Sequence, residues 1–135
     1  YFSPDGRDIV TASADGTAKI WNATSGECES TFMGHADWLR SASFSMDGKR
    51  IVTTSGDCSA KVWDVSTGKC KHTLTGHTDW LRSAAFSHDG ELVATASKDG
   101  TAKVWNSESG ECRLTLTGHS SWVRSCSFSP QGLLP

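Results

Sequence analysis

A repeat of 42 residues runs through the whole chain. Segments 35–76 and 77–118 are identical at 24 of their 42 positions. The residues that recur at this interval are Trp21, Trp63 and Trp105, His35, His77 and His119, and Phe2, Phe44, Phe86 and Phe128. One unit of such a repeat cannot bury its hydrophobic faces alone, so neighbouring units must stack on one another. The 135 residues therefore predict about three stacked copies of one structural unit.

Each unit contains four short β-like runs and no helical periodicity. In the central unit the runs cover 39–45, 50–55, 60–63 and 70–74, with turn residues between them. Short runs separated by turns at this spacing are typical of an antiparallel β-meander. The second and third runs are almost wholly small or apolar, as strands covered on both faces are, whereas the fourth alternates and has one side in water. Radially stacked four-stranded sheets, here called blades, form a β-propeller.

We therefore predict an all-β propeller fragment over residues 1–135, with about three four-stranded antiparallel blades. Inner strands are expected near 39–45 and 81–87, and an extra inner strand near 123–128. Propellers typically contain four to eight blades, so three blades leave an open arc unless oligomerisation completes it. Both ends of the chain fall inside the repeat pattern, and we expect a longer array.

Composition argues against several classes of function. The 13 basic and 15 acidic residues are scattered and give a net charge of −2, so neither a nucleic-acid partner nor a membrane partner is expected. The five cysteines form no Cys-x-x-Cys pair, and we predict no metal and no cofactor. Free thiols favour a reducing compartment, so the expected location is the cytoplasm, with the nucleus as an alternative.

Several motifs of the repeat resemble those of the WD40 family. They are the Gly-His pair, the Phe-Ser-x-Asp-Gly turn, the Ser-x-Asp turn and the closing tryptophan. The closing dipeptide is Trp63-Asp64 in the central unit, but Trp21-Asn22 and Trp105-Asn106 in the flanking units. The resemblance covers essentially the whole chain. It implies a non-catalytic β-propeller that mediates protein–protein interactions.

Two units also carry histidine, serine, aspartate and tryptophan at equal offsets. The two sets are His35, Ser55, Asp57 and Trp63, and His77, Ser97, Asp99 and Trp105. One interpretation is a Ser/His/Asp catalytic triad. The resemblance implies instead a structural tetrad, in which the tryptophan donates a hydrogen bond, the serine relays it, and the histidine connects it to the aspartate. We favour the tetrad and predict no catalytic residue, because a site copied in every unit has no pocket of its own.

A second set of tryptophans opens the first strand of each unit, each followed two residues later by arginine. Residues i and i+2 of a strand share a face, and tryptophan and arginine are enriched at binding hot spots. In WD40 proteins this position lies on the face around the central channel. The predicted protein-binding residues are Trp38, Arg40, Trp80, Arg82, Trp122, Arg124 and Lys98. The alternative is that these tryptophans pack between blades and the arginines pair with Asp37 and Asp79.

The expected function is a non-catalytic scaffold for protein or peptide partners within a larger multidomain or multisubunit assembly. One alternative is a receptor for phosphopeptides or substrates, for example in a ubiquitin-ligase or signalling assembly, that uses the Arg/Trp arc. Another is an engineered or recently amplified repeat array without an evolved ligand. Self-association through the incomplete terminal blades is a further expectation, because His119 lacks the downstream residues that Trp21 and its neighbours would provide.

Overall fold

The computed structural model describes residues 2–129, and within them it contains strands and no helix. The first sheet consists of β1 (Asp8–Ala12), β2 (Thr17–Asn22) and β3 (Cys28–Met33). The second consists of β4 (Leu39–Phe44), β5 (Arg50–Ser55), β6 (Ala60–Asp64) and β7 (Cys70–Leu74). The third consists of β8 (Leu81–Phe86), β9 (Leu92–Ser97), β10 (Ala102–Asn106) and β11 (Cys112–Leu116).

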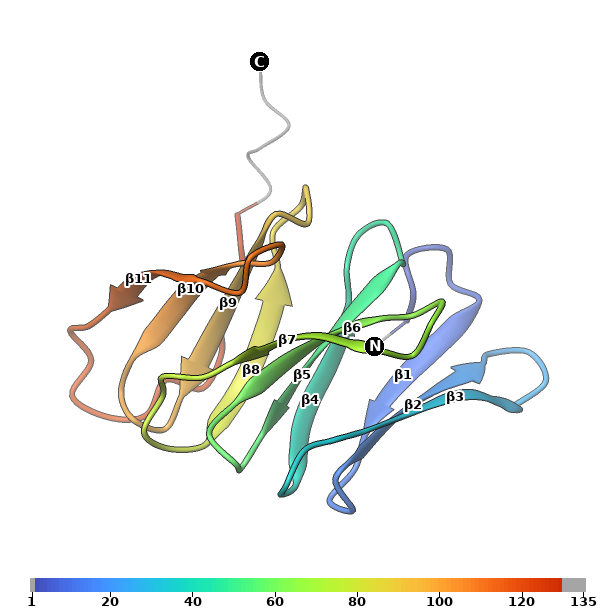
Figure 1. Cartoon of the computed structure of the whole chain (residues 1–135), viewed down its shortest axis with the longest axis horizontal. Coiled ribbons are helices and arrows are strands. Elements are labelled where there is room, and N and C mark those ends of the chain that lie inside the picture. The colour runs from blue at the N-terminus through green and yellow to red at the C-terminus, as the bar shows by residue number, and fades with distance from the viewer. Residues whose placement is uncertain (1, 130–135) are drawn as a thin grey trace.

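The three sheets stand side by side like the blades of an open fan (Figure 1). Each sheet is an antiparallel meander in which every strand pairs with the next one in sequence. The repeat is visible in the register, since Ile51 faces Trp63 and Val93 faces Trp105. The sheets do not close into a ring within the described residues. The all-β propeller fragment predicted from the repeat is therefore confirmed.

The hydrophobic core lies between the sheets rather than inside any one of them. Two clusters of buried side chains fill the two gaps. In the first gap the Phe32 and Trp63 rings meet edge to face, with centroids 5.5 Å apart. In the second gap Leu74 and Trp105 are almost fully buried. Burying a large apolar side chain contributes about 1.5–3 kcal/mol, so each blade is stabilised mainly by its neighbours.

A polar link joins the second and third blades. The Arg50 guanidinium donates to the carbonyl oxygen of Gly90 at 2.9 Å and lies 3.2 Å from the Glu108 carboxylate. His72 Nε2 lies 2.6 Å from the carbonyl oxygen of Glu108. One repeat earlier and one repeat later, the position of Arg50 holds Asp8 and Leu92. The link is therefore particular to this pair of blades, and no sequence pattern predicts a role for His72 in it.

The first blade is shorter than the other two, and the extra inner strand predicted at 123–128 is wrong. The first blade has three strands, and only an isolated bridge between Phe2 and Ile9 stands in the place of its inner strand. The segment 123–128 is not a strand, although the Val123 amide donates to the Ser97 carbonyl at 2.9 Å. A strand needs a ladder partner, and the described residues place none on the outer side of this segment. The two other predicted inner strands, 39–45 and 81–87, coincide with β4 and β8.

Since the described residues form no helix, they include no helical segment long and apolar enough to cross a membrane.

Candidate protein-interaction surface

A chain of buried hydrogen bonds connects the closing tryptophan of a blade to its Gly-His loop. In the third blade the Trp105 indole donates to Thr95 Oγ1 at 2.9 Å, and Thr95 Oγ1 lies 2.8 Å from His77 Nε2. His77 Nδ1 lies 2.9 Å from Asp99 Oδ2. The second blade repeats this chain through Trp63, Thr53, His35 and Asp57, with distances of 2.9, 2.7 and 3.0 Å. The network pins the loop to the two central strands of its sheet.

The predicted role of the serines as relays is wrong. Ser55 Oγ donates to the carbonyl oxygen of Asp37 at 3.3 Å and accepts the Asp57 amide at 3.1 Å. Ser97 occupies the same place in the third blade and donates to the carbonyl oxygen of Trp80 at 2.9 Å. Both serines lie two residues farther along their strand than the threonines, about 7 Å away, and so beyond reach of the indole.

The hydroxyl at the centre of the chain follows from the strand register. Ile51 is the ladder partner of Trp63, and Thr53, two residues on, lies on the same face of β5. The signal was present in the sequence, because Thr11, Thr53 and Thr95 recur at the 42-residue interval. In the first blade the Trp21 indole likewise donates to Thr11 Oγ1 at 2.9 Å.

The donors and acceptors of this hydrogen-bond network determine which ring nitrogen of His77 carries the hydrogen. An indole only donates, so Thr95 accepts from Trp105 and offers its own hydrogen to His77 Nε2. His77 then carries its hydrogen on Nδ1 and donates it to Asp99. Burial lowers the pKa of His77, and this outweighs the opposite effect of the Asp99 carboxylate. Burial raises the pKa of Asp99, but hydrogen bonds from Thr101 and His77 outweigh it and hold that pKa well below its usual range.

The same geometry separates the network from a catalytic triad. A nucleophilic serine must share a hydrogen bond with its histidine. In the described residues both ring nitrogens of His77 are engaged, Nδ1 by Asp99 and Nε2 by Thr95, and Ser97 donates to backbone carbonyls. The described residues also contain no group of three or more histidine, cysteine, aspartate or glutamate side chains that could hold a metal ion.

The predicted protein-binding residues lie next to one another and form one continuous row of alternating tryptophan rings and cations. Arg40 Cζ lies 5.6 Å from the Trp38 ring centroid and 4.8 Å from that of Trp80. Lys98 Nζ lies 4.5 Å from the centroids of both Trp80 and Trp122. All these separations fall within the range of cation–π attraction. The tryptophan–cation row consists of Trp38, Arg40, Trp80, Arg82, Lys98, Trp122 and Arg124.

A bulge aims the arginines of the row. Leu39 pairs with Ser55 and Ser41 with Thr54, so Arg40 has no ladder partner on β5. Arg82 is skipped in the same way on β8, between Leu81 and Ser83. Bulges of this kind redirect a side chain. The prediction that residues i and i+2 of a strand share a face assumes a regular strand and does not anticipate these bulges.

The row is partly packed and partly exposed. Trp38 and Trp122 are 53% and 42% exposed, whereas Trp80 is half-buried. Asp37 Oδ1 accepts the Trp38 amide and Asp79 Oδ1 accepts the Trp80 amide. Within the described residues no ion pair joins either carboxylate to an arginine of the row. The alternative that these aspartates pair with the arginines is therefore not what the structure has.

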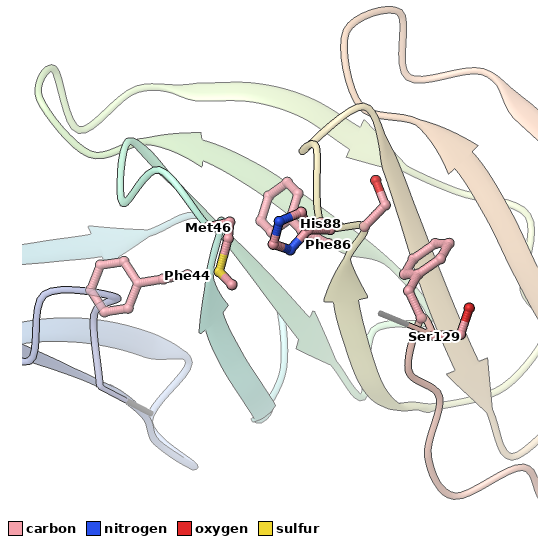
Figure 2. Close-up of a pocket in the computed structure, with 7 residues that line it drawn as sticks. Phe44, Met46, Phe86, His88 and Ser129 are labelled. Atoms are coloured by element: carbon pink, nitrogen blue, oxygen red, sulfur yellow. The ribbon is translucent and has the colours of Figure 1, made fainter. Parts of the chain in front are cut away.

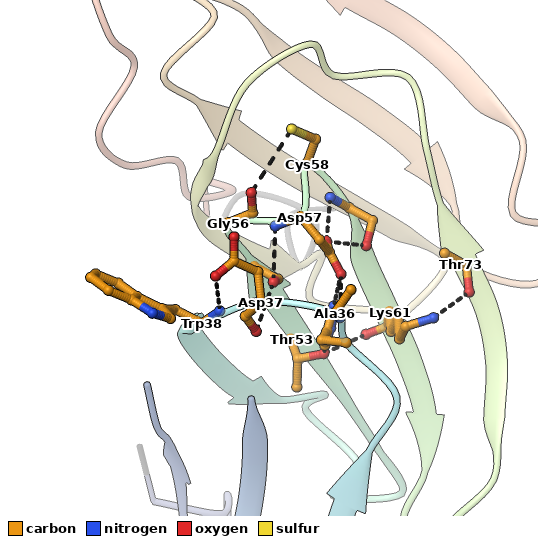
Figure 3. A network of polar contacts seen from close by, with 12 residues as sticks. Ala36, Asp37, Trp38, Thr53, Gly56, Asp57, Cys58, Lys61 and Thr73 are labelled. Carbon is orange, nitrogen blue, oxygen red and sulfur yellow. Dashed lines mark hydrogen bonds and ion pairs between the residues drawn. The ribbon is translucent and has the colours of Figure 1, made fainter. Parts of the chain in front are cut away.

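A pocket of about 180 Å³ lies within the row. Its walls are Asp37, Trp38, Arg40, Gly56 and Trp80. Figure 3 shows Asp37 and Gly56 together at the tight turn that also carries Asp57 and Cys58. Arg40 Nε is buried here and has no hydrogen-bond partner among the described residues.

A second pocket, of about 270 Å³, lies near the opposite ends of the inner strands (Figure 2). The recurring phenylalanines Phe44, Phe86 and Phe128 line it together with Met46, Ser87, His88 and Ser129. It is mainly apolar, because the three phenylalanines and Met46 make up most of its lining. No sequence pattern predicts a role for His88, and none follows from its place in the lining of this pocket.

Replacing Thr95 with valine tests the hydrogen-bonded chain. The change keeps the shape but leaves the Trp105 indole and His77 Nε2 without their partner, which should cost about 2–4 kcal/mol of the free energy of unfolding. Urea denaturation followed by tryptophan fluorescence measures the loss. The control is Thr95→Ser, which keeps the hydroxyl and should cost about 1 kcal/mol. Equal losses in the two variants would mean that the hydroxyl is not what matters.

Comparison with known proteins agrees with this architecture. The WD40 family profile, described as "WD domain, G-beta repeat", matches residues 1–22, 26–64, 68–106 and 110–134. A periodic tryptophan protein 2 homolog of Dictyostelium discoideum is 56% identical over 34 residues, which are 25% of this chain and 4% of that protein. The nuclear distribution protein PAC1 of Gibberella zeae is 47% identical over 38 residues, 28% of this chain and 8% of that protein. The chain thus spans a small fraction of the length of these relatives. It belongs to the WD40-repeat family, whose repeats serve in general as protein-interaction scaffolds.

Proposed function

We propose that this chain is a non-catalytic docking platform that holds a protein partner against the tryptophan–cation row. The observation that carries the proposal is the alternation of aromatic rings and cations along the second blade, the third blade and the segment that follows them. Tryptophan and arginine side chains dominate binding hot spots because they combine a large contact area with directed hydrogen bonding. The platform would act within a larger assembly, in the cytoplasm or the nucleus, which the five unpaired thiols also favour.

One observation favours a more specific partner, a peptide that carries a phosphate or another anionic group. The arginines of the row are held by aromatic faces rather than by the nearby carboxylates, so their hydrogen-bond donors stay available. Arg40 Nε is buried and has no acceptor within residues 2–129. A guanidinium binds a phosphate through two parallel hydrogen bonds, which would satisfy this donor.

Peptide arrays test both forms of the proposal. Peptides that the unaltered chain binds should bind at least about 10-fold more weakly to Trp38→Ala, because a hot-spot truncation costs more than about 1.4 kcal/mol. Met33→Ala, at a side chain that is 69% exposed and outside the row, is the matched control. Equal binding by Trp38→Ala and Met33→Ala would contradict the docking platform. If removing phosphate from the bound peptides changes nothing, the phosphopeptide form is wrong.

We also propose that two copies of the chain associate head to tail through their uncovered sheets. A methyl group on Gly34 would lie 3.2 Å from the Trp63 ring, and one on Gly76 would lie 3.6 Å from Trp105. A methyl group on Gly118 would meet nothing within 4 Å among the described residues. Leu116, at the repeat position of the buried Phe32 and Leu74, is 50% exposed. The third blade therefore offers the slot for a closing tryptophan, and Trp21 of a second copy fits it.

The same docking would complete the first blade. His119 stands one repeat after His77, and Thr11 stands at the repeat position of Thr95. In a head-to-tail pair, His119 of one copy would occupy the place beside Thr11 and Asp15 of the other. Two copies would contribute about six blades, within the range in which propellers close.

Sedimentation equilibrium measures this association directly. The expected result is a species of twice the chain mass of 14.5 kDa, which Trp21→Ala should shift toward the monomer. Trp38→Ala, which changes the row in the interior of the arc and away from both ends, should leave the dimer intact. A compact monomer at every concentration would overturn head-to-tail association and leave the docking platform untouched.

A further inference from the structure

One position of the tight turn differs in every repeat. It holds Ala14 in the first blade, Gly56 in the second and Lys98 in the third. Its backbone is placed in the same way in the last two, because the Gly56 amide donates to the carbonyl of Trp38 at 2.9 Å and the Lys98 amide donates to that of Trp80 at 2.8 Å. The backbone of Gly56 is therefore placed relative to Trp38 as the backbone of Lys98 is placed relative to Trp80.

Lys98 shows what this position does when it carries a long cation. Its ammonium nitrogen lies 4.5 Å from the Trp80 centroid and 4.5 Å from the Trp122 centroid, so it fills the gap between those two rings. At the preceding gap, between Trp38 and Trp80, the turn carries only the hydrogen of Gly56, and the cation that lies over both rings is Arg40. The pocket of about 180 Å³ lies at this gap.

We propose that this pocket binds the side-chain ammonium of a lysine on the partner protein. The inference rests on the proposed docking function and names the chemistry of one contact within it. The incoming lysine would take the place that Lys98 takes one blade later, between two tryptophan faces. Two indole faces attract an ammonium more strongly than a neutral side chain of the same size.

The carboxylate of Asp37 lies beside Gly56 in the lining of this pocket. Asp37 Oδ2 would lie 3.3 Å from a methyl group on Gly56, so this oxygen borders the pocket. Its other oxygen, Oδ1, is engaged by the Trp38 amide. An ammonium entering beside Gly56 would therefore meet one carboxylate oxygen at close range, which adds a charge-assisted contact to the ring contacts.

The cation already present in the gap does not prevent this. Arg40 lies between Trp38 and Trp80, but two cations are also accommodated at Trp122, where Arg82 Cζ lies 5.9 Å and Lys98 Nζ 4.5 Å from the ring centroid. Carboxylates surround the turn. Burial, and then the charges of Asp79, Asp57, Asp99 and Asp37, raise the pKa of the Cys58 thiol two residues from Gly56. Asp37 is the carboxylate that lines the pocket itself, opposite the Arg40 guanidinium.

Chemical-shift mapping of the indole N–H groups tests the proposal on the whole chain. The probe is N-acetyl-lysine methylamide, and the neutral control is N-acetyl-norleucine methylamide, which has the same aliphatic stem. The lysine probe should shift the resonances of Trp38 and Trp80 and bind at least about fivefold more tightly than the norleucine probe. Equal affinity for the two probes would overturn the proposal.

Three variants of the same position make the result specific. Gly56→Lys places the chain's own ammonium in the gap and should abolish the lysine-dependent shifts, whereas Gly56→Ala, which copies Ala14 of the first blade, should retain them. Lys98→Gly should open the second gap and add lysine-dependent shifts at Trp122. Shifts that persist unchanged in Gly56→Lys would overturn the assignment of the pocket.

The peptides from the array experiment separate this inference from the proposed function. If a bound partner peptide is lost by Trp38→Ala but held equally by Gly56→Lys and Gly56→Ala, the docking platform stands and the lysine pocket is wrong. If Trp38→Ala binds as well as the unaltered chain, the docking platform itself is wrong.

Discussion

The hydroxyl of one threonine in each of the two complete blades joins the buried and the exposed halves of the structure. Thr95 accepts from the Trp105 indole on β10 and contacts His77 in the loop before β8. The same loop is held a second time, because the Thr78 amide donates to Asp99 Oδ2 at 3.1 Å. Trp80 follows two residues later, so a largely buried network fixes the position of this tryptophan of the row. A fully satisfied buried network of this kind is more stable than its separate bonds suggest.

The sequence predicted the features that depend on repetition. The fixed interval located the closing tryptophans and the histidines, and the apolar central runs predicted sheets covered on both faces. The interval did not distinguish Thr95 from Ser97, since both recur and both carry a hydroxyl. Cross-strand register decides between them, and only the threonine is near the ladder partner of Trp105.

Other features depended on contacts that no local pattern contains. The segment 123–128 reads like the inner strands of the other units, but a strand forms only where a partner accepts its hydrogen bonds. The bulges at Arg40 and Arg82 turn both side chains toward the tryptophans, and a two-residue alternation cannot reveal them. Arg50 and His72 contact backbone carbonyls of the third blade, and these contacts depend on how the second and third blades pack together.

The positions where the repeats differ are where this chain acquires properties of its own. Cys58 adopts a φ of 73°, a left-handed conformation that Gly16 and Gly100 adopt in the sister turns, and such strain costs a non-glycine residue about 1–2 kcal/mol. Gly56 and Lys98 occupy the same position of the turn, and a pocket lies beside Gly56 where the side chain of Lys98 extends over the rings one blade later. The hydrogen-bond network is the same in the second and third blades, and the side chains that differ between these blades lie in the turn next to the row.

The protonation state of His77 tests this account most directly. Because its pKa is lowered in the folded chain, the unfolded chain takes up a proton near the ordinary value of 6.5 while the folded chain does not, and stability falls as the pH drops below that value. Long-range ¹H–¹⁵N correlation spectra identify which ring nitrogen carries the hydrogen. The account predicts a neutral ring with its hydrogen on Nδ1 at about pH 6.5. A ring protonated on both nitrogens at that pH, or one with its hydrogen on Nε2, would contradict it.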